Sequence, residues 1–326
     1  MRVLLTADTA GGVWTYAVEL ARELERRGVE VVIAARGLEP RPTEGLDVHF
    51  LRSKLEWMDD PWDDLAAGAE WLLDLRDEVE PDVVHASGYG EAALPWGVPI
   101  VCVSHSDVLS WFEAVRGEPA PGEWSLYREL VEAGLAAADV VVSPTRAQLA
   151  SLERLYGFDG ARLVIPNGRR PLRPRPKRRL IAAAGRAWDE AKGLEALARV
   201  DAGWPIEIAD GSRSDAEVEA LLARAAIFAE PARYEPFGLA AVEAASAGAA
   251  LVLGDIPSLR EVWADAAVYV SDERELERAL TRLVRNEQLR DDYALRARRR
   301  ALRYSPERMA AGYLALYTRL TARVAA

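Results

Sequence analysis

The chain has little cysteine, lysine and histidine. A single cysteine, Cys102, stands among 326 residues, so an intrachain disulfide and a cysteine-based metal site are both excluded. No run of about 20 apolar residues occurs, and the N-terminus reaches Asp8 too soon for a signal peptide. These absences exclude a disulfide scaffold, and they predict a cytoplasmic protein with no membrane-spanning segment.

Positive charge is scarce in the first half of the chain. Residues 1–168 carry 14 lysines and arginines against 29 acidic residues, whereas residues 169–326 carry 27 against 23. Nucleic acids and anionic lipid surfaces need clustered cations, so the sequence argues against nucleic acid as a partner and against strong membrane association. With 50% hydrophobic and 29% charged residues, the chain has the composition of a globular protein and is long enough for two domains.

Short apolar runs alternate with amphipathic stretches along the whole chain. Val3–Thr6 is followed by a glycine pair, a periodic stretch over Val13–Arg27 and a second apolar run at Val29–Ala35. This alternation predicts an α/β fold with parallel sheets covered by helices. Further strands are expected at 83–84, 100–103, 140–142, 162–165, 180–184, 206–209, 227–229 and 250–253, and further helices at 65–80, 125–138, 215–225 and 239–247.

One segment interrupts the alternation. Arg169–Arg179 holds three prolines and seven cations, and neither a helix nor a central strand tolerates that many prolines. We therefore expect an N-terminal Rossmann-like domain over residues 1–170, a linker over 171–179 and a second Rossmann-like domain over 180–305. Residues 306–326 form a last helix with an apolar stripe.

Ligands of open parallel sheets bind beyond the carboxyl ends of the strands. After the first strand, Gly11 and Gly12 open a helix and could approach a phosphate, although a tight turn needs the same residues. A dinucleotide dehydrogenase is disfavoured because GxGxxG is absent. The second strand also ends at Arg36, without the acidic residue that would hold a ribose.

Gly185–Gly193 contains one of only three lysines in a chain with 38 arginines. Lys192 stands out against that background. A compact ammonium suits a phosphate oxygen in a narrow site, and the planar fork of Arg186 can support it. The alternative is that Lys192 is an exposed cation at a helix start.

Arg233–Glu243 combines a proline with two glutamates eight residues apart. Pro236 suits a first helical position, so the backbone amides of residues 237–239 would form an anion seat. Glu243 falls on an otherwise apolar helix, where a carboxylate is costly unless it accepts hydrogen bonds such as those of sugar hydroxyls. The helix dipole alone explains Glu235 and explains Glu243 less well.

Together these motifs resemble the retaining glycosyltransferases of family 4, which have the GT-B fold of two Rossmann-like domains. The resemblance rests on the Gly-Gly loop, the GRxxxxxKG segment from Gly185, EPFGLxxxEAxxxG from Glu235, and Ile256–Trp263. It implies transfer of a hexosyl group from a UDP- or GDP-sugar to a hydroxyl of a small-molecule or glycan acceptor, with no required metal or other cofactor. It also implies that the helix after Pro306 crosses back to the first domain.

The resemblance assigns roles to particular residues. It implies that Arg186 and Lys192 bind the donor diphosphate, Glu235 the donor sugar and Glu243 the ribose, while His105 lies beside the sugar. The catalytic residues are then His105, Glu235, Arg186 and Lys192, and the donor-binding residues are Gly11, Gly12, Gly185, Arg186, Lys192, Glu235, Phe237, Gly238, Leu239 and Glu243. His85, Asp107 and Trp111 are expected on the acceptor side, with a structural role for His85 as an equal alternative.

Two other interpretations remain open. A non-catalytic homologue could serve as a partner subunit. A glycoside phosphorylase of the same architecture would need a Schiff-base lysine for pyridoxal phosphate, and Lys54 and Lys177 lie in charged or proline-rich stretches.

The acidic first half also bears on the acceptor. It predicts a soluble, neutral or cationic acceptor, because acidic residues crowd a segment expected near the cleft: Asp59, Asp60, Asp63 and Asp64. The alternative is that these residues only make the surface soluble.

Overall fold

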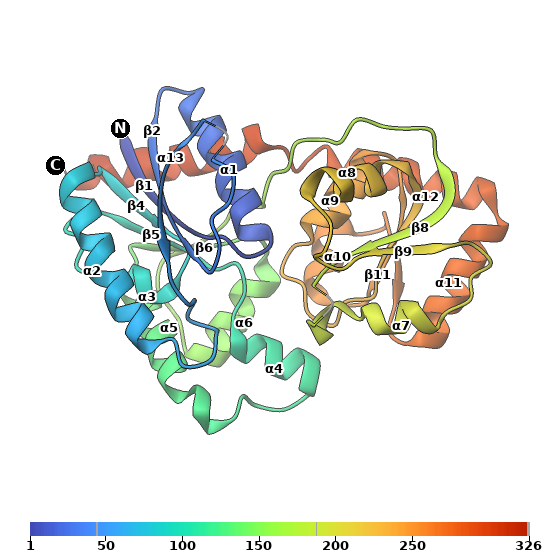
Figure 1. Cartoon of the computed structure of the whole chain (residues 1–326), viewed down its shortest axis with the longest axis horizontal. Helices are drawn as coiled ribbons and strands as arrows, with labels where there is room; N and C mark the ends of the chain where they lie inside the picture. Colours follow the sequence, from blue (N-terminus) through green and yellow to red (C-terminus); the bar gives the residue numbers. More distant parts are fainter. Residues whose placement is uncertain (44, 187, 325–326) are drawn as a thin grey trace. The chain divides into compact units, whose positions relative to one another are not determined.

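The computed structural model describes residues 1–43, 45–186 and 188–324, and the chain forms two compact units (Figure 1). Unit 1 comprises Met1–Ser110, Pro119–Gly168 and Pro306–Ala326, and unit 2 comprises Trp111–Glu118 and Arg169–Ser305. Each unit contains one parallel sheet between two layers of helices. The predicted α/β architecture with two parallel sheets is confirmed.

The sheet of unit 1 has seven strands in the order β3-β2-β1-β4-β5-β6-β7. Its central strands are short apolar runs buried on both faces because helices cover both sides. The bounds are β1 Arg2–Asp8, β2 Glu30–Gly37, β3 Asp47–Arg52, β4 Val83–Ala86, β5 Ile100–Val103, β6 Val140–Ser143 and β7 Arg162–Val164. Strand β3 was not predicted, because this edge strand is only half-buried and lacks an apolar run.

Helices of unit 1 form two layers around this sheet. On one face lie α1 Gly12–Glu25 and α13 Pro306–Val324, whose apolar stripe through Tyr313 and Tyr317 is fully buried. On the other face lie α2 Trp62–Val79, α3 Tyr89–Ala92, α5 Ser125–Ala137 and α6 Arg146–Tyr156, with the short 3-10 turn η1 Gly122–Trp124 before α5. Helix α4, Val108–Arg116, begins in unit 1 and continues into unit 2.

The sheet of unit 2 has five strands in the order β12-β11-β10-β8-β9. The bounds are β8 Arg178–Ala184, β9 Ile206–Ala209, β10 Ala225–Glu230, β11 Ala250–Gly254 and β12 Val268–Val270. Helices α8 Asp215–Arg224, α9 Leu239–Ser246, α10 Pro257–Trp263 and α12 Glu287–Ala301 cover one face, and α7 Leu194–Arg199 and α11 Glu273–Arg285 cover the other. Strand β8 starts two residues before the expected Leu180, because the exposed Arg178 and Arg179 still have extended backbone.

Candidate active site

The carboxyl edge of the unit 2 sheet brings together residues from two predicted motifs. Gly185 follows β8, and the 3-10 turn η2, Glu190–Lys192, carries Lys192 back to the edge. Gly193 has φ +64°, and a Cβ there would lie 2.5 Å from the carbonyl oxygen of Pro231. Only glycine fits this turn, so the backbone itself holds the lysine in place.

Lys192 lies between two glutamates. Its Nζ is 3.3 Å from Glu230 Oε1, and it forms a second, closer ion pair with Glu235. Burial lowers the pKa of Lys192, but the two carboxylates outweigh burial and keep the pKa above its ordinary value. Lys192 is thus a permanently charged, largely buried ammonium, and the interpretation as an exposed cation is wrong.

Arg186 is fixed by an aspartate that sequence reasoning missed. Its Nη2 lies 2.9 Å from Asp189 Oδ2, and Asp189 also accepts hydrogen bonds from Trp111 Nε1 at 3.1 Å and from the amide of Ala191. Burial raises the pKa of Asp189, but the hydrogen bonds from Arg186 and Trp111 bring it below its usual range. The Nε of Arg186 is buried and has no partner within the described ranges, so a donor remains for a ligand.

Two of the three amides of the predicted anion seat before α9 bind a side chain of the protein itself. Glu235 Oε1 accepts hydrogen bonds from the amides of Phe237 at 3.1 Å and Gly238 at 2.9 Å. Pro236 does not start the helix as expected. The helix begins at Leu239, because Gly238 has φ +88° and ends the preceding turn. Burial raises the pKa of Glu235, but Lys192 and these two amides outweigh burial. The pKa therefore lies below its ordinary value, and the carboxylate stays ionised.

Glu243, on α9, is held by the segment that enters unit 2. Arg169 forms a close ion pair with Glu243 through Nε, and its Nη2 lies 2.9 Å from Glu219 Oε1. Burial raises the pKa of Glu243, and Arg169 partly offsets this. The cost of a carboxylate on an apolar helix is therefore met by an arginine, without sugar hydroxyls.

Unit 1 carries the remaining predicted donor-side residues at the carboxyl edge of its own sheet. Gly11 caps α1 with φ +65°, and both Gly11 and Gly12 are exposed. His105 follows β5, and its Nε2 is buried without a hydrogen-bond partner in the part of the chain that is described. Its ring packs edge-on against Tyr16, with centroids 4.6 Å apart. Burial lowers the pKa of His105 to about 4, so the imidazole is neutral at neutral pH.

Two of the residues expected on the acceptor side, His85 and Asp107, are buried in unit 1. His85 is fully buried, and its Nε2 and Nδ1 lie 3.1 Å from Tyr16 Oη and 2.5 Å from Tyr317 Oη. Buried Asp107 accepts hydrogen bonds at the start of α4 and from Gln148 and Tyr156. Neither the carboxylate nor the imidazole is open to solvent, and an acceptor contact for these two residues stays a prediction. Trp111 contacts Asp189 in unit 2 instead.

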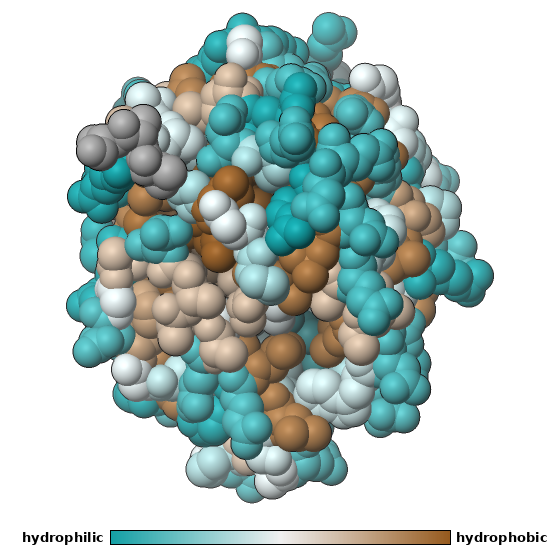
Figure 2. Space-filling view, turned by 90° about the vertical axis from the view of Figure 1, so that its left-hand side faces the viewer, coloured by the Kyte–Doolittle hydropathy of each residue, from teal (hydrophilic) through white to brown (hydrophobic). Residues whose placement is uncertain are grey.

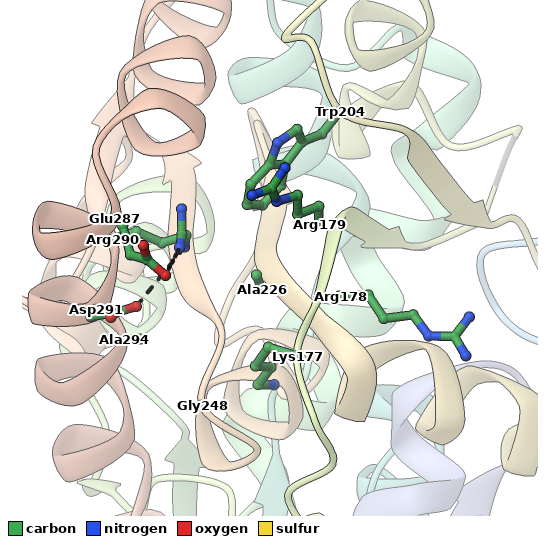
Figure 3. Close-up of a pocket in the computed structure, with 10 residues that line it drawn as sticks. All are labelled: Lys177, Arg178, Arg179, Trp204, Ala226, Gly248, Glu287, Arg290, Asp291 and Ala294. Carbon is green, nitrogen blue, oxygen red and sulfur yellow. Dashed lines mark ion pairs between the residues drawn. The ribbon is translucent and has the colours of Figure 1, made fainter.

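A cavity of about 230 Å³ lies elsewhere in unit 2 (Figure 3). Its lining consists of Lys177, Arg178, Arg179, Trp204, Ala226, Gly248, Glu287, Arg290, Asp291 and Ala294. Strands β8, β10 and β11 begin here, so the cavity is at the amino edge, at the end of the sheet opposite to Lys192. Arg290 pairs with Glu287 at 3.4 Å and lies 5.0 Å from the Trp204 ring centroid, so part of its charge is used internally.

Within the described ranges, no three histidine, cysteine, aspartate or glutamate side chains are grouped to hold a metal ion. None of the helices in those ranges combines the length and apolar character needed to cross a membrane.

Comparison with known proteins gives matches over both units. Residues 10–171 match the model of Glycosyltransferase Family 4, and residues 208–300 match that of Glycosyl transferases group 1. A D-inositol 3-phosphate glycosyltransferase of Xylanimonas cellulosilytica is 34% identical over 180 residues, which are 49% of this chain and 42% of that protein. A D-inositol 3-phosphate glycosyltransferase of Acidothermus cellulolyticus is 28% identical over 193 residues, which are 49% of this chain and 40% of that protein. The chain thus spans less than half the length of these curated relatives.

Solved structures resemble the whole chain. Sucrose-phosphate synthase from Thermosynechococcus elongatus has a TM-score of 0.80 at 19% identity, covering 99% of this chain and 100% of that one. Anabaena HepE in complex with UDP-glucose has a TM-score of 0.75 at 14% identity, and the match covers 98% of this chain and 100% of that one. These likenesses confirm the predicted GT-B fold. With the two family matches and the motifs around Lys192 and Glu235, they show that the chain belongs to glycosyltransferase family 4.

Proposed function

We propose that the chain moves a hexosyl group from a nucleotide-diphosphate sugar, a UDP- or GDP-sugar, to an acceptor hydroxyl with retention of anomeric configuration. The observation that carries the proposal is the buried, charged Lys192 beside Arg186 at the carboxyl edge of unit 2. Two cations at this edge suit a diphosphate, and the buried Nε of Arg186, which has no partner among the described residues, can donate to it. Membership of family 4 supports the same chemistry.

In this proposal, unit 2 binds the donor and stabilises the leaving group. The bond between the anomeric carbon and the diphosphate oxygen breaks, and the acceptor oxygen forms its new bond on the same face of the sugar. The leaving phosphate oxygen takes the acceptor proton. Lys192 and Arg186 would stabilise the negative charge that develops on the diphosphate, and electrostatic stabilisation of this kind usually lowers the reaction barrier more than any other single effect.

From unit 1, Gly12 and His105 are proposed as further contacts of the donor. An exposed glycine at a helix start lets a phosphate approach the backbone amides. Neutral His105 offers Nε2 as a hydrogen-bond partner for a sugar hydroxyl.

A pyridoxal phosphate-dependent phosphorylase is disfavoured by the surroundings of the three lysines. Lys192 is ion-paired and its raised pKa makes it a poor nucleophile. The Nζ of Lys54 donates to the carbonyls of Asp59 and Asp60. Burial lowers the pKa of Lys177 to about 8, but this lysine lies at the amino edge of the sheet and donates to the Ala223 carbonyl.

The direct test is an assay of nucleotide diphosphate release. Wild-type protein is incubated with UDP-glucose, UDP-N-acetylglucosamine, GDP-mannose and ADP-glucose, with and without a panel of sugar and polyol acceptors. We expect acceptor-dependent release with one donor and a thermal shift with the matching nucleotide. If no nucleotide shifts the melting temperature and none is released, the partner-subunit interpretation replaces this proposal.

The two glutamates of the EPFGLxxxE motif should differ in their effects. If Glu243 holds the ribose, Glu243→Gln weakens both the free nucleotide diphosphate and the nucleotide sugar. If Glu235 holds the sugar, Glu235→Gln spares the free nucleotide but lowers turnover. Calorimetry with UDP and GDP, followed by kinetics, measures both effects. Equal losses of free nucleotide affinity in the two variants would contradict this division of roles.

We propose a soluble, neutral or cationic acceptor, supported by the net charge of -15 over residues 1–168. Two of the four crowded aspartates, Asp63 and Asp64, lie in the first turn of α2, where the helix dipole favours acids. Those two carry no information about the acceptor.

The expected result is weak binding of the protein to anionic membranes. Figure 2 shows hydrophilic residues mostly towards the top and edges of the visible face, with hydrophobic residues over much of its middle. Co-sedimentation with phosphatidylserine vesicles at low salt should retain little protein. Strong retention that is lost as salt rises, and is abolished by Arg173→Glu with Arg175→Glu, would instead show that the basic segment binds the membrane.

A further inference from the structure

Glu230, at the end of β10, is a buried carboxyl group that no motif marks. Its side chain is 2% exposed, and Oε1 lies 3.3 Å from Lys192 Nζ. The other oxygen, Oε2, is buried and has no hydrogen-bond partner among the residues that the structure describes. An ionised carboxylate in that state is costly, whereas a protonated one carries an O–H that a ligand can accept from.

The cation that pairs with Glu230 is shared with a second carboxylate. Lys192 also pairs with Glu235, whose Oε1 is already bound to two backbone amides. Arg186, the next cation along this edge, is paired with Asp189. Thus one ammonium faces two glutamates.

Charged groups on the neighbouring elements have partners of their own. Asp255, after β11, pairs with Arg260, and Glu243 on α9 pairs with Arg169. Among the described residues around Glu230, the ionised groups that act on it are therefore Lys192 and Glu235.

The charge balance of this edge is unfavourable for an anion. With both glutamates ionised, Lys192, Glu230 and Glu235 carry a net charge of -1, and the pair of Arg186 and Asp189 adds nothing. A diphosphate that enters here adds two negative charges close to a carboxylate. Repulsion between like charges in one site favours protonation of the carboxylate. Burial and the Glu235 carboxylate already raise the pKa of Glu230 to about 7.

We infer that Glu230 takes up a proton when a nucleotide-sugar diphosphate binds, and that the neutral carboxyl group then positions Lys192 without competing for its charge. This inference rests on the proposed donor role of unit 2. Glu230 is a positioning residue and acts through Lys192. The consequence is a donor affinity that falls as pH rises above neutral, because the proton must then be taken from solution.

Calorimetry at several pH values tests the proton uptake. UDP-glucose and GDP-mannose are suitable probes, because a diphosphate diester does not titrate between about pH 5.5 and 8.5, a range chosen to bracket the shifted group. Titration at pH 8 in buffers of different ionisation enthalpy should give an uptake approaching one proton per bound donor for wild type. The affinity should fall by up to about tenfold per pH unit above neutral.

Glu230→Gln is the decisive variant, because the amide has the shape of the protonated acid and cannot ionise. We expect its donor affinity to be independent of pH in this range, to exceed that of wild type at pH 8, and to be accompanied by no proton uptake. Glu287→Gln, which changes an exposed glutamate of the same unit, should keep the wild-type profile. Identical pH profiles for wild type and Glu230→Gln would overturn the inference.

A measurement without ligand separates this inference from the proposed function. The pKa of Glu230 in the folded protein is raised above that of an unfolded glutamate, about 4.3. Its contribution to stability is therefore complete below pH 4 and is lost as pH rises through 7. The melting temperature of Glu230→Gln relative to wild type should accordingly increase between pH 5 and pH 8. A constant difference would overturn the inference, whereas failure of every probe to bind wild type would count against the proposed function alone.

Discussion

Replacing Lys192 with alanine is expected to weaken binding of the donor by about 1.5 to 3 kcal/mol, roughly 10- to 150-fold in the dissociation constant. The side chain is a buried ammonium at the carboxyl edge of the unit 2 sheet, and a hydrogen bond to a charged phosphate oxygen depends on it. Calorimetry with the nucleotide sugar that wild type binds measures the loss directly. An unchanged affinity would remove Lys192 from the diphosphate site.

This variant needs controls, because it also leaves two glutamates without their cation. Lys192→Ala is expected to destabilise unit 2, since a buried charge without a partner is costly. Combining Lys192→Met with Glu230→Gln restores the charge balance and should recover stability while donor binding stays weak. Lys54→Ala serves as the matched lysine control, because Lys54 lies in unit 1 and donates only to backbone carbonyls in the contacts that are described.

Replacing Arg36 with alanine is expected to destabilise unit 1 by about 3 to 5 kcal/mol, which is the cost of removing one partner of a buried ion pair. Arg36 is 4% exposed at the end of β2, and its Nε and Nη2 lie 3.0 and 2.7 Å from Glu91 Oε1. Thr6 and the amide of Gly88 bind the other oxygen of Glu91. Without Arg36 this carboxylate remains buried with no cation.

Chemical denaturation monitored by circular dichroism measures the loss. Arg52→Ala is the matched control, because Arg52 pairs with Glu39 at 3.4 Å on the exposed surface and such pairs contribute at most about 1 kcal/mol. Arg36→Met combined with Glu91→Leu should recover much of the stability, since neither buried charge remains. A loss from Arg36→Ala no larger than that from Arg52→Ala would contradict the assignment.

One glycine shows a feature of this structure that packing explains and local sequence does not. Gly68 lies on α2, where a Cβ would come within 2.4 Å of Arg36 Nη1. The sequence contains the glycine and the arginine 32 residues apart, and nothing in their local pattern pairs them. Only the packing of α2 against β2 explains why this helix position has no side chain.

The sequence by itself determined the class of fold, the family and the prominence of Lys192. Apolar runs that alternate with periodic stretches specify buried strands and covering helices through local physics, because side-chain periodicity follows directly from backbone geometry. Lys192 was found because it is rare in an arginine-rich chain, and Glu235 because it lies in a compact motif. The motif around Glu235 is contained within about ten residues, whereas the rarity of lysine is a property of the whole composition.

The tertiary structure alone decided which groups face one another. Glu230 and Asp189 carry no marker in the sequence, yet they hold Lys192 and Arg186. In the proposed anion seat at residues 237–239, Glu235 accepts hydrogen bonds from the amides of Phe237 and Gly238. The sequence left two roles open for His85, and the structure shows its ring hydrogen-bonded to Tyr16 and Tyr317. For Glu230 and His85 the physical reason is that ion pairs and burial depend on distances between segments that are remote in the chain, which periodicity does not encode. The contacts of Asp189 with Arg186 and of Glu235 with the two amides lie within three residues and depend instead on the exact backbone path of a turn, which periodicity does not encode either.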